Sequence, residues 1–398
     1  MSIFTMQSYT SSYFDKIIDR RNTQSYKFDR LPDVFGEDDI LPLWVADMDF
    51  RVPQEVSSAI KKRMEHEIYG YTFHSGAFFQ SAVDWVKRRH GWTIQPEWFS
   101  FSPGVVSALN FCVMAYSEPG DKVIIQTPVY PPFYTAVSDH QRTIVRNPLK
   151  KSGERYEMDF DHLEKIIDDK TKMLILCHPH NPVGRVWTEA ELTRLAEICV
   201  RHRLTVVCDM IHSDLMLNKA SCPSLIDISQ DIASQTVSLI APSKTFNIAG
   251  LSTSLMFTSN PVLKEKFERE VNKIHVGSGN IFGDVAFEAA YRYGDQWLDT
   301  LIDYLNTNFD LLDEWTKKSS YVRYIRPEGT FLAWLDFSPS GLSGKKLYDT
   351  VISKAKVGLN RGIEFGSEAM SFMRINVGCP SPILKKAIKQ IDDVLSRI

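Results

Sequence analysis

Between about residues 98 and 260, short apolar runs rich in β-favouring residues alternate with stretches of helical periodicity. The runs are WFSFS, DKVIIQTP, TKMLILCHP, LTVVCD and QTVSLIAPS, and segments such as VVSALNFCVMAYSE and TEAELTRLAEICVRH lie between them. Strands that alternate with helices in this way form a parallel sheet covered by crossover helices. The alternation therefore predicts an α/β fold with a mostly parallel sheet flanked by helices.

The C-terminal part has a different pattern. From about residue 284 a long helical stretch leads into two strand candidates, RYIRP and TFLAWLDF. This order of elements predicts a second, smaller α+β domain. We expect a large domain at 46–285, and a small domain made of 1–45 and 286–398.

Charge and hydropathy exclude several classes of partner. Lys plus Arg number 46 and Asp plus Glu number 49, so the formal charge is −3 and a general nucleic-acid surface is not expected. The chain lacks the run of about 18 to 20 apolar residues of a membrane span, and its opening segment lacks the apolar core of a signal peptide. The six cysteines are far apart without CxxC spacing, which predicts buried thiols in the cytoplasm. The expected partner is a small molecule.

Ligands of open α/β sheets bind beyond the carboxyl ends of the strands, so the residues after each run are candidate site residues. The first run is followed by Gly104, Val105 and Val106 at the start of a helix. Free N–H groups and the helix dipole at such a position attract an anion, typically phosphate. An ordinary turn before a helix is the alternative interpretation.

The second and third runs end in loops with candidate contact residues. Tyr130 follows the second run among rigid prolines, where its ring can stack on a planar ligand or simply pack in the loop. Asn181 follows the third run in a turn-rich loop that presents its amide. His178 and His180 lie beside it without a third ligand nearby, so no metal site is expected.

The fourth and fifth runs end in ionisable groups. Asp209 closes the run LTVVCD, His212 follows three residues later, and Lys244 follows the run QTVSLIAPS. A charge placed at the end of a buried strand must be paired or functional, and desolvation of a lysine lowers its pKa and makes the amine nucleophilic. A structural ion pair between Asp209 and Lys244 is the alternative.

These residues would combine an anion-binding site, an aromatic ring, an amide, a carboxylate and an amine. This combination suits a planar, phosphorylated, aldehyde-bearing pyridine. A lysine can condense with the aldehyde, and an acid can keep the ring nitrogen protonated so that the ring accepts electrons. The cofactor expected from this combination is pyridoxal 5′-phosphate.

Eight segments are also recognisable as motifs: PLWVADMDF, IYGYT, SPGVVSALN, TPVYPPF, HPHNPVGRVWT, CDMIHSDL, APSKTFNIAGL and FMRINVGCP. Through them the chain resembles the fold-type I pyridoxal-phosphate enzymes of the class I/II aminotransferase family, and within that family the cystathionine β-lyase group. The resemblance covers nearly the whole chain and implies fold type I.

The resemblance implies roles for the residues around the cofactor. Lys244 matches the Schiff-base lysine, which also moves the α-proton of the substrate. Asp209 matches the partner of the pyridinium nitrogen, and Asn181 matches the residue that hydrogen-bonds the phenolic oxygen. His212 occupies the position of a tyrosine with a similar task, although a satisfied core histidine remains the alternative.

Further matches concern the ring and the phosphate of the cofactor. Tyr130 matches the ring-stacking aromatic residue, and its place beside the reacting atoms also makes it a candidate catalytic residue. The backbone of Gly104, Val105 and Val106 matches the phosphate cradle, and Ser243 matches a phosphate-binding hydroxyl.

Substrate binding and assembly are implied in the same way. Arg374 matches the arginine that grips the substrate α-carboxylate with its bidentate fork, with a surface ion pair as the alternative. The backbone at Val45 and Ala46 lines the carboxylate pocket, with Asn181 beside it. Tyr71 matches the tyrosine that reaches the phosphate of the neighbouring subunit, which implies a homodimer with shared active sites.

The chain departs from the family pattern at informative positions. Many aminotransferases of this superfamily have an arginine eight residues after the lysine, where this chain has Ser252, and this favours the lyase branch. Cystalysin-like members read TPVYYPF, whereas Pro131 replaces the second tyrosine here. Met210 stands where the family usually has an acidic residue, and we have no physical account of that change.

The expected function is that of a pyridoxal-phosphate carbon–sulfur β-lyase. It would cleave L-cystathionine or related cysteine S-conjugates to a thiol, pyruvate and ammonia. An aminotransferase that uses the same lysine, aspartate and arginine is the alternative, because fold and cofactor do not separate the two reactions. A regulatory protein that binds another protein is an alternative of a different class.

Overall fold

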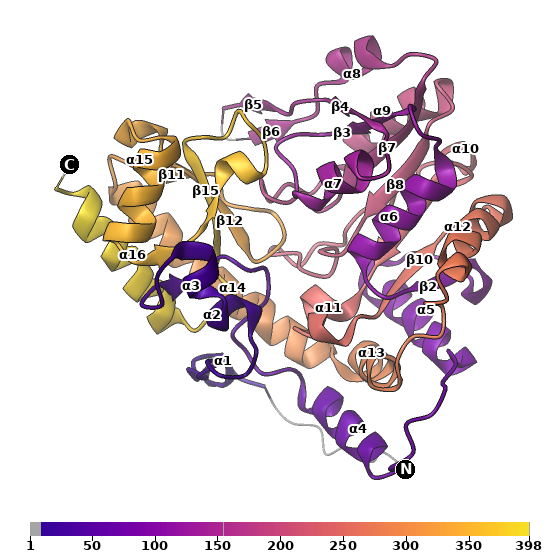
Figure 1. Ribbon diagram of the computed structural model, residues 1–398, viewed down its shortest axis with the longest axis horizontal. Coiled ribbons are helices and arrows are strands. Elements are labelled where there is room, and N and C mark those ends of the chain that lie inside the picture. The colour runs from indigo at the N-terminus through magenta and orange to yellow at the C-terminus, as the bar shows by residue number, and fades with distance from the viewer. Residues whose placement is uncertain (1–8, 154, 398) are drawn as a thin grey trace.

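The computed structural model describes residues 9–153 and 155–397, and a seven-stranded sheet lies at the centre of its larger part (Figure 1). The spatial order is β2-β10-β9-β8-β7-β3-β4, and every neighbouring pair is parallel except the two pairs that β10 makes. The bounds are β2 (Phe99–Ser102), β3 (Lys122–Ile125), β4 (Thr143–Arg146), β7 (Thr171–Cys177), β8 (Thr205–Asp209), β9 (Thr236–Ile240) and β10 (Ser254–Phe257). The prediction of an α/β fold with a mostly parallel sheet is confirmed.

The sheet has a hydrophobic core on each face. Successive strand residues point to opposite faces, so Val206 and Cys208 of β8 pack in one core and Val207 packs in the other. Helix α9 (Glu189–Arg201) covers the first core and α6 (Val105–Tyr116) covers the second. Burial on both faces explains why the strand runs are apolar at nearly every position.

Other helices surround the sheet. They are α7 (Pro132–Ser138), α8 (Phe160–Ile166), α10 (Gln230–Ala233) and α12 (Pro261–Lys273). Two hydrogen bonds explain why α9 begins where it does. The Thr188 hydroxyl accepts from the Glu191 amide, and the Glu191 carboxylate accepts from the Thr188 amide. This reciprocal pair satisfies two amides that the first helical turn leaves free. A short hairpin of β5 (Lys150–Ser152) and β6 (Arg155–Glu157) lies apart from the sheet.

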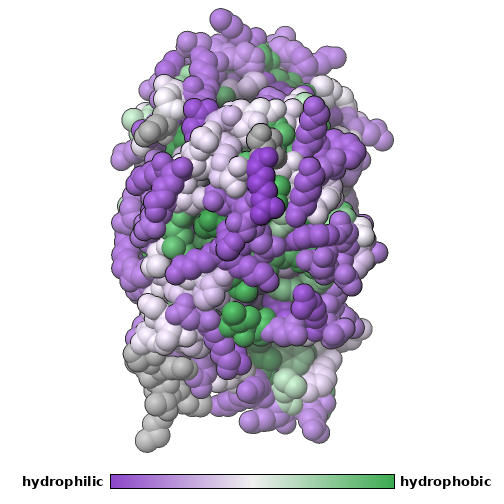
Figure 2. All heavy atoms as spheres, turned by 90° about the vertical axis from the view of Figure 1, so that its left-hand side faces the viewer, coloured by the Kyte–Doolittle hydropathy of each residue, from purple (hydrophilic) through white to green (hydrophobic). Residues whose placement is uncertain are grey.

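A second, antiparallel sheet with the order β11-β12-β15-β14 forms the smaller part of the molecule. Its elements are β11 (Arg323–Tyr324), β12 (Leu332–Asp336), β14 (Asn360–Arg361) and β15 (Phe372–Asn376), with α14 (Asp295–Lys318), α15 (Gly344–Tyr348) and α16 (Ser381–Leu395) packed around them. The helical C-terminal pattern and both strand candidates are thus found in the structure. Figure 2 shows that the face on this side is mostly hydrophilic, with hydrophobic residues in small separate groups.

The N-terminal elements lie beside this second sheet (Figure 1). They are α1 (Ser11–Phe14), α2 (Tyr26–Asp29), α3 (Leu31–Phe35) and β1 (Leu41–Pro42), and β1 pairs with β13 (Val357–Gly358). The pairing supports a small domain built from 1–45 and 286–398 beside a large domain at 46–285. That division stays a prediction, and residues 1–8 of it lie outside the described part of the chain.

Three helices pack together at the base of the view in Figure 1: α4 (Gln54–Met64), α5 (Gly76–His90) and α13 (Ile281–Tyr293). Helix α13 ends before Gly294 and α14 begins directly after it. A Cβ at Gly294 would lie 2.3 Å from the Phe246 ring, so only glycine allows this close approach. Within 9–153 and 155–397, no helix combines the length and the apolar character that crossing a membrane requires.

Two strands of the large sheet, β4 and β10, were not predicted. Strand β10 runs antiparallel and separates β2 from the parallel strands, so β2 pairs with β10 alone. The run SLMF has only four residues between polar neighbours, and a short apolar run of this kind has no periodicity that separates a strand from a turn.

Candidate active site

The polar residues that follow the strands meet at one cavity of about 270 Å³. It lies beyond the carboxyl ends of the parallel strands, where ligands of open α/β sheets bind. Of the residues predicted for the site, those that line it are Ala46, Gly104, Val105, Val106, Tyr130, Asn181, Asp209, His212, Ser243 and Lys244. Segments from residue 46 to residue 244 thus contribute to one pocket.

Lys244 lies in α11 (Pro242–Thr245), directly after β9. Its Nζ donates a hydrogen bond to the carbonyl oxygen of Ala46 at 2.7 Å. Burial lowers the pKa of Lys244 to about 8, and the charge of Arg374 acts in the same direction. About half of the amines are therefore neutral, and so nucleophilic, at that pH.

Asp209 is the last residue of β8, and its carboxylate accepts a hydrogen bond from the Ile211 amide at 3.1 Å. Burial raises the pKa of Asp209 to about 6, although the amide bond and the positive charge of Lys244 oppose the shift. The carboxyl group therefore remains mostly ionised at neutral pH. The structure thus places a negative charge and an amine on the wall of the same cavity.

Arg374 in β15 of the small sheet reaches the edge of this site. Its Nη1 donates to Asn181 Oδ1 at 3.0 Å, and its Nη2 donates to Asn360 Oδ1 at 2.6 Å and to the Trp44 carbonyl at 3.1 Å. These partners are all neutral, and Nε has no hydrogen-bond partner within the described part of the chain. Burial lowers the pKa of Arg374 to about 10. A buried guanidinium without a carboxylate partner is costly, so this position suits an anionic ligand.

The N-terminus of α6 offers a second anion seat on the opposite side of the site. Its N-cap residue, Gly104, makes no side-chain cap and has φ +153°, a conformation that favours glycine. The first amides of α6 therefore remain free to bind a ligand. Val105 and Val106, which carry these amides, line the cavity together with Ser243.

Two rings complete the wall of the cavity. Burial raises the pKa of Tyr130, so its phenol keeps its proton. Burial lowers the pKa of His212 well below its ordinary value, and the charges of Lys244 and Arg374 add to this effect. His212 is therefore a neutral imidazole, and its Nδ1 has no hydrogen-bond partner within the described residues.

Two of the predicted residues lie outside this cavity. Tyr71 is fully exposed, at 107% of its reference area, and lies outside the cavity. Val45 does not line the cavity, because its carbonyl accepts a hydrogen bond from Asn376 Nδ2 at 2.6 Å. The backbone group that contacts Arg374 is the carbonyl of Trp44, one residue earlier.

Sequence reasoning missed two side chains of the site. Asn360 binds Arg374, and it arrives there through the pairing of β14 with β15, which places the two residues opposite each other. Asn376 holds the carbonyls of Val45 and Asp47, each at 2.6 Å. Asn376 lies two residues after Arg374, so strand alternation places both on one face and offered a signal for it.

The fold and this site define the class of the protein. Residues 38–391 match the family model for aminotransferases of class I and II, and the chain belongs to this family.

Individual relatives make the relationship more specific. The chain is 42% identical to cystathionine beta-lyase PatB of Bacillus subtilis (strain 168), over 96% of this chain and 100% of that protein. It is similar to the structure of cystalysin from Treponema denticola, which contains pyridoxal 5′-phosphate, with a TM-score of 0.92, 33% identity, and 96% and 98% of the two chains covered. A PLP-bound protein of Clostridium difficile 630, described as an aminotransferase, gives a TM-score of 0.94, 38% identity, and 96% and 99% coverage.

The cofactor is pyridoxal 5′-phosphate, and the cavity fits it. The uncapped start of α6 suits a phosphate, Asp209 suits a protonated ring nitrogen, and the partly neutral amine of Lys244 suits an aldehyde. The unpaired His212 Nδ1 leaves one more polar group for the ligand.

Proposed function

We propose that the protein is a PLP-dependent carbon–sulfur β-lyase that cleaves L-cystathionine or a related cysteine S-conjugate to a thiol, pyruvate and ammonia. The observation that carries the proposal is the buried guanidinium of Arg374, bound to Asn181 and lacking a carboxylate partner among the described residues. Such a group suits the α-carboxylate of an amino acid. The relationship to PatB, a cystathionine beta-lyase, supports the reaction type and the substrate.

Lys244 has two tasks in this reaction. Its amine would hold the cofactor, and its Nζ, when free, would take the proton from the substrate Cα. When bound, pyridoxal 5′-phosphate supplies an electron sink that stabilises negative charge at that carbon. The carboxylate of Asp209 keeps the pyridine nitrogen protonated, which is what its ionised state at neutral pH permits. The electron pair that proton removal leaves at Cα then expels the thiolate from Cβ.

Arg374 and Asn181 orient the substrate. The guanidinium binds the α-carboxylate with two parallel hydrogen bonds, while Asn181 and the Ala46 segment border the same pocket. A carboxylate held there would keep the substrate Cα near Lys244, because Asn181, the partner of Arg374, lines the same cavity as the amine. Correct orientation of the reacting bond lowers the entropic part of the barrier.

The remaining predicted residues hold the cofactor. The amides of Val105 and Val106 after Gly104, with the Ser243 hydroxyl, bind the phosphate. Tyr130 lines the cavity, where its ring would stack on the cofactor and shield it from water. His212 and Asn181 contribute polar contacts to the ring substituents.

We further propose that the protein is a homodimer with shared active sites. The segment 68–73 exposes large hydrophobic side chains, namely Ile68, Tyr69, Tyr71 and Phe73. Such a cluster indicates a surface that another chain covers. In the dimer Tyr71 would reach the phosphate of the neighbouring site, which accounts for its distance from the cavity of its own chain.

We place the protein in the cytoplasm. All six cysteines are free and buried, and two of them, Cys177 and Cys208, lie in strands of the large sheet. Thiols kept in this state are typical of a reducing compartment.

The alternative is amino-group transfer, which the relationship to the Clostridium difficile protein favours. The test compares wild type with Lys244→Ala, supplied with L-cystathionine and no 2-oxo acid. Wild type should release pyruvate, and the variant should lose both turnover and the absorbance of lysine-bound cofactor. Turnover and absorbance that persist in the folded variant would overturn the role of Lys244.

A further inference from the structure

A buried carboxylate outside the cavity accepts three side-chain hydrogen bonds. Asp214 Oδ1 accepts from Trp85 Nε1 at 2.9 Å and from His90 Nε2 at 2.8 Å, and Oδ2 accepts from the Thr245 hydroxyl at 2.7 Å. Burial on its own would raise the pKa of Asp214, but the contacts with His90, Thr245 and Trp85 outweigh it and lower the pKa. The carboxylate is therefore charged at neutral pH, and charge-assisted hydrogen bonds of this kind are strong.

The three hydrogen bonds connect segments far apart in the sequence. Trp85 and His90 belong to α5, Asp214 lies in the turn after β8, and Thr245 is the last residue of α11. Helix α11 has a single turn and no side-chain cap, and a helix this short is not stable on its own. Its orientation therefore depends on contacts such as the one between Thr245 and Asp214, directly beside Lys244.

The turn that carries Asp214 also carries His212. The Leu215 amide donates to the His212 carbonyl at 3.0 Å, and the Ser213 amide donates to the Met210 carbonyl at 2.9 Å. One carboxylate thus anchors two pieces of the active-site wall: the helix with the amine and the turn with the imidazole.

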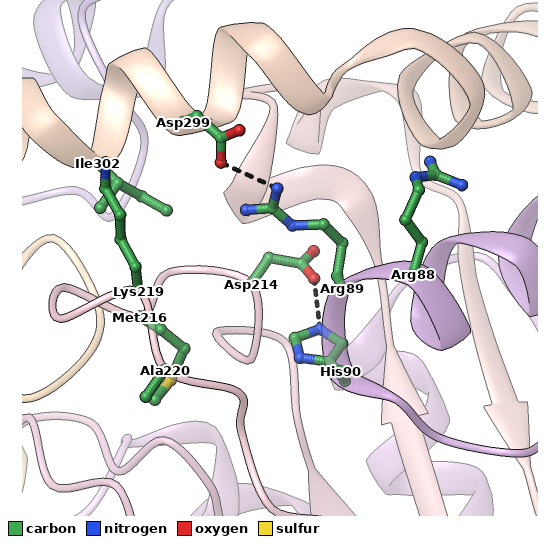
Figure 3. A pocket seen from close by; sticks show the side chains of 9 residues that line it. All are labelled: Arg88, Arg89, His90, Asp214, Met216, Lys219, Ala220, Asp299 and Ile302. Carbon is green, nitrogen blue, oxygen red and sulfur yellow. Dashed lines mark hydrogen bonds and ion pairs between the residues drawn. The ribbon is translucent and has the colours of Figure 1, made fainter.

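His90 and Asp214 border a second cavity of about 200 Å³, shown in Figure 3. The cationic side chains that line it are each paired with a carboxylate: Arg88 with Asp295 at 3.0 Å, Arg89 with Asp299 at 2.9 Å, and Lys219 with Asp303 at 2.7 Å. The rim therefore offers little net charge to an ion. What the cavity does offer is access for a small molecule to the position of the His90 ring.

We propose that His90, Asp214 and Thr245 form a positioning network that fixes Lys244 and His212 for the reaction. None of the three touches the cofactor or the substrate in this proposal. His90 holds the carboxylate from outside, the carboxylate holds the Thr245 hydroxyl, and the hydroxyl fixes the helix that carries Lys244. The tests of this network that measure turnover rest on the proposed lyase function.

The primary test is the pair Thr245→Ser and Thr245→Val, because serine keeps the hydroxyl and valine keeps the shape. The serine variant should retain kcat within about twofold, whereas the valine variant should lose about 10- to 100-fold in kcat with little change in KM, since a misplaced amine slows the chemical step. A readout independent of turnover is the pH at which the absorbance of the bound cofactor changes. This midpoint should shift in the valine variant alone.

A second test uses the cavity beside His90. His90→Ala should lower kcat. Added imidazole should raise the kcat of this variant at least about tenfold, because it can occupy the vacated space next to Asp214. Asp299→Asn is the matched control, because it changes the rim of the same cavity without contact to Asp214. Imidazole should leave this control unchanged.

The outcomes separate the two proposals. A wild-type protein that releases no pyruvate contradicts the proposed lyase function, while the absorbance comparison still decides the network. An active wild type with equal kcat and equal absorbance midpoint in both Thr245 variants overturns the network alone. So does a folded, cofactor-loaded His90→Ala variant that does not respond to imidazole.

Discussion

Arg374 Nη1 donates a hydrogen bond to Asn181 Oδ1 at 3.0 Å, across the contact between the two sheets of the molecule. Asn181 follows β7 of the large sheet, and Arg374 lies in β15 of the small sheet, 193 residues later. The proposed substrate pocket therefore lies where both parts of the chain meet. This arrangement leads to predictions about the arginine and about the residues that hold it.

Replacement of the guanidinium by an ammonium group should weaken substrate binding. We expect Arg374→Lys to raise KM about 10- to 100-fold with a smaller effect on kcat, because lysine cannot form the paired hydrogen bonds to a carboxylate. Steady-state kinetics with L-cystathionine measure both constants. The control is Arg269→Lys on the exposed surface of α12, where the pair with Glu265 is far less demanding. An unchanged KM in the Arg374 variant would contradict the assignment.

Asn360, the partner of Arg374 in the small sheet, should also affect KM. Asn360→Ala removes an acceptor at 2.6 Å from a buried cation, and loss of such a hydrogen bond costs about 1.5 to 3 kcal/mol, or about 10- to 100-fold in KM. Asn360→Asp should raise KM further, because the new carboxylate competes with the substrate for the guanidinium. A KM in the aspartate variant below that of wild type would refute this account.

Asp209 should lower the stability of the cofactor-free protein. Burial raises its pKa from about 3.9 in an unfolded chain to about 6. The folded state therefore loses stability as the pH rises from about 4 to about 6, where the carboxyl group is ionised in the unfolded chain but still protonated in the folded one. Asp209→Asn should therefore stabilise the cofactor-free protein by about 3 kcal/mol at most at pH 7.5. The gain should vanish below about pH 4, where the carboxyl is protonated in both states.

Chemical unfolding of cofactor-free wild type and variant at the two pH values measures this difference. The same substitution should strongly reduce turnover of the loaded enzyme, since an amide cannot hold the pyridine nitrogen protonated. Equal stability of the two proteins at pH 7.5 would count against the proposed cost of the buried charge.

A mixing experiment tests the shared active sites. Lys244→Ala and Tyr71→Ala should each be nearly inactive alone, but in a mixed dimer one site receives an intact lysine and an intact tyrosine. Random exchange of subunits should therefore restore about 25% of wild-type activity, given one intact site in half of the dimers. Sedimentation of the mixture checks the oligomeric state. Activity that stays at the level of the separate variants would contradict shared sites.

The sequence predicted the site well where a residue directly follows a strand. Asp209 and Lys244 close two apolar runs, and the parallel sheet brings such ends together, so their shared cavity followed from topology. Arg374 was predicted only through the resemblance of its motif to the family. Its contact with Asn181 depends on how two separate sheets pack.

Other features depend on contacts that no local pattern records. Asn360 reaches Arg374 through the register of β14 against β15, and His90 reaches Asp214 across 124 residues. Strand β10 was missed because a strand of four residues, three of them apolar, carries no distinct period. The contact between Arg374 and the Trp44 carbonyl was not predicted, since an extended segment fixes which carbonyls face inward only after it is packed.

The most direct test of the central claim is the stoichiometry of products from L-cystathionine, measured with the purified holoenzyme in the absence of any 2-oxo acid. The account predicts equal amounts of homocysteine and pyruvate, formed continuously and unaffected by later addition of a 2-oxo acid. No thiol in the absence of a 2-oxo acid, with amino-group transfer once one is supplied, would contradict it.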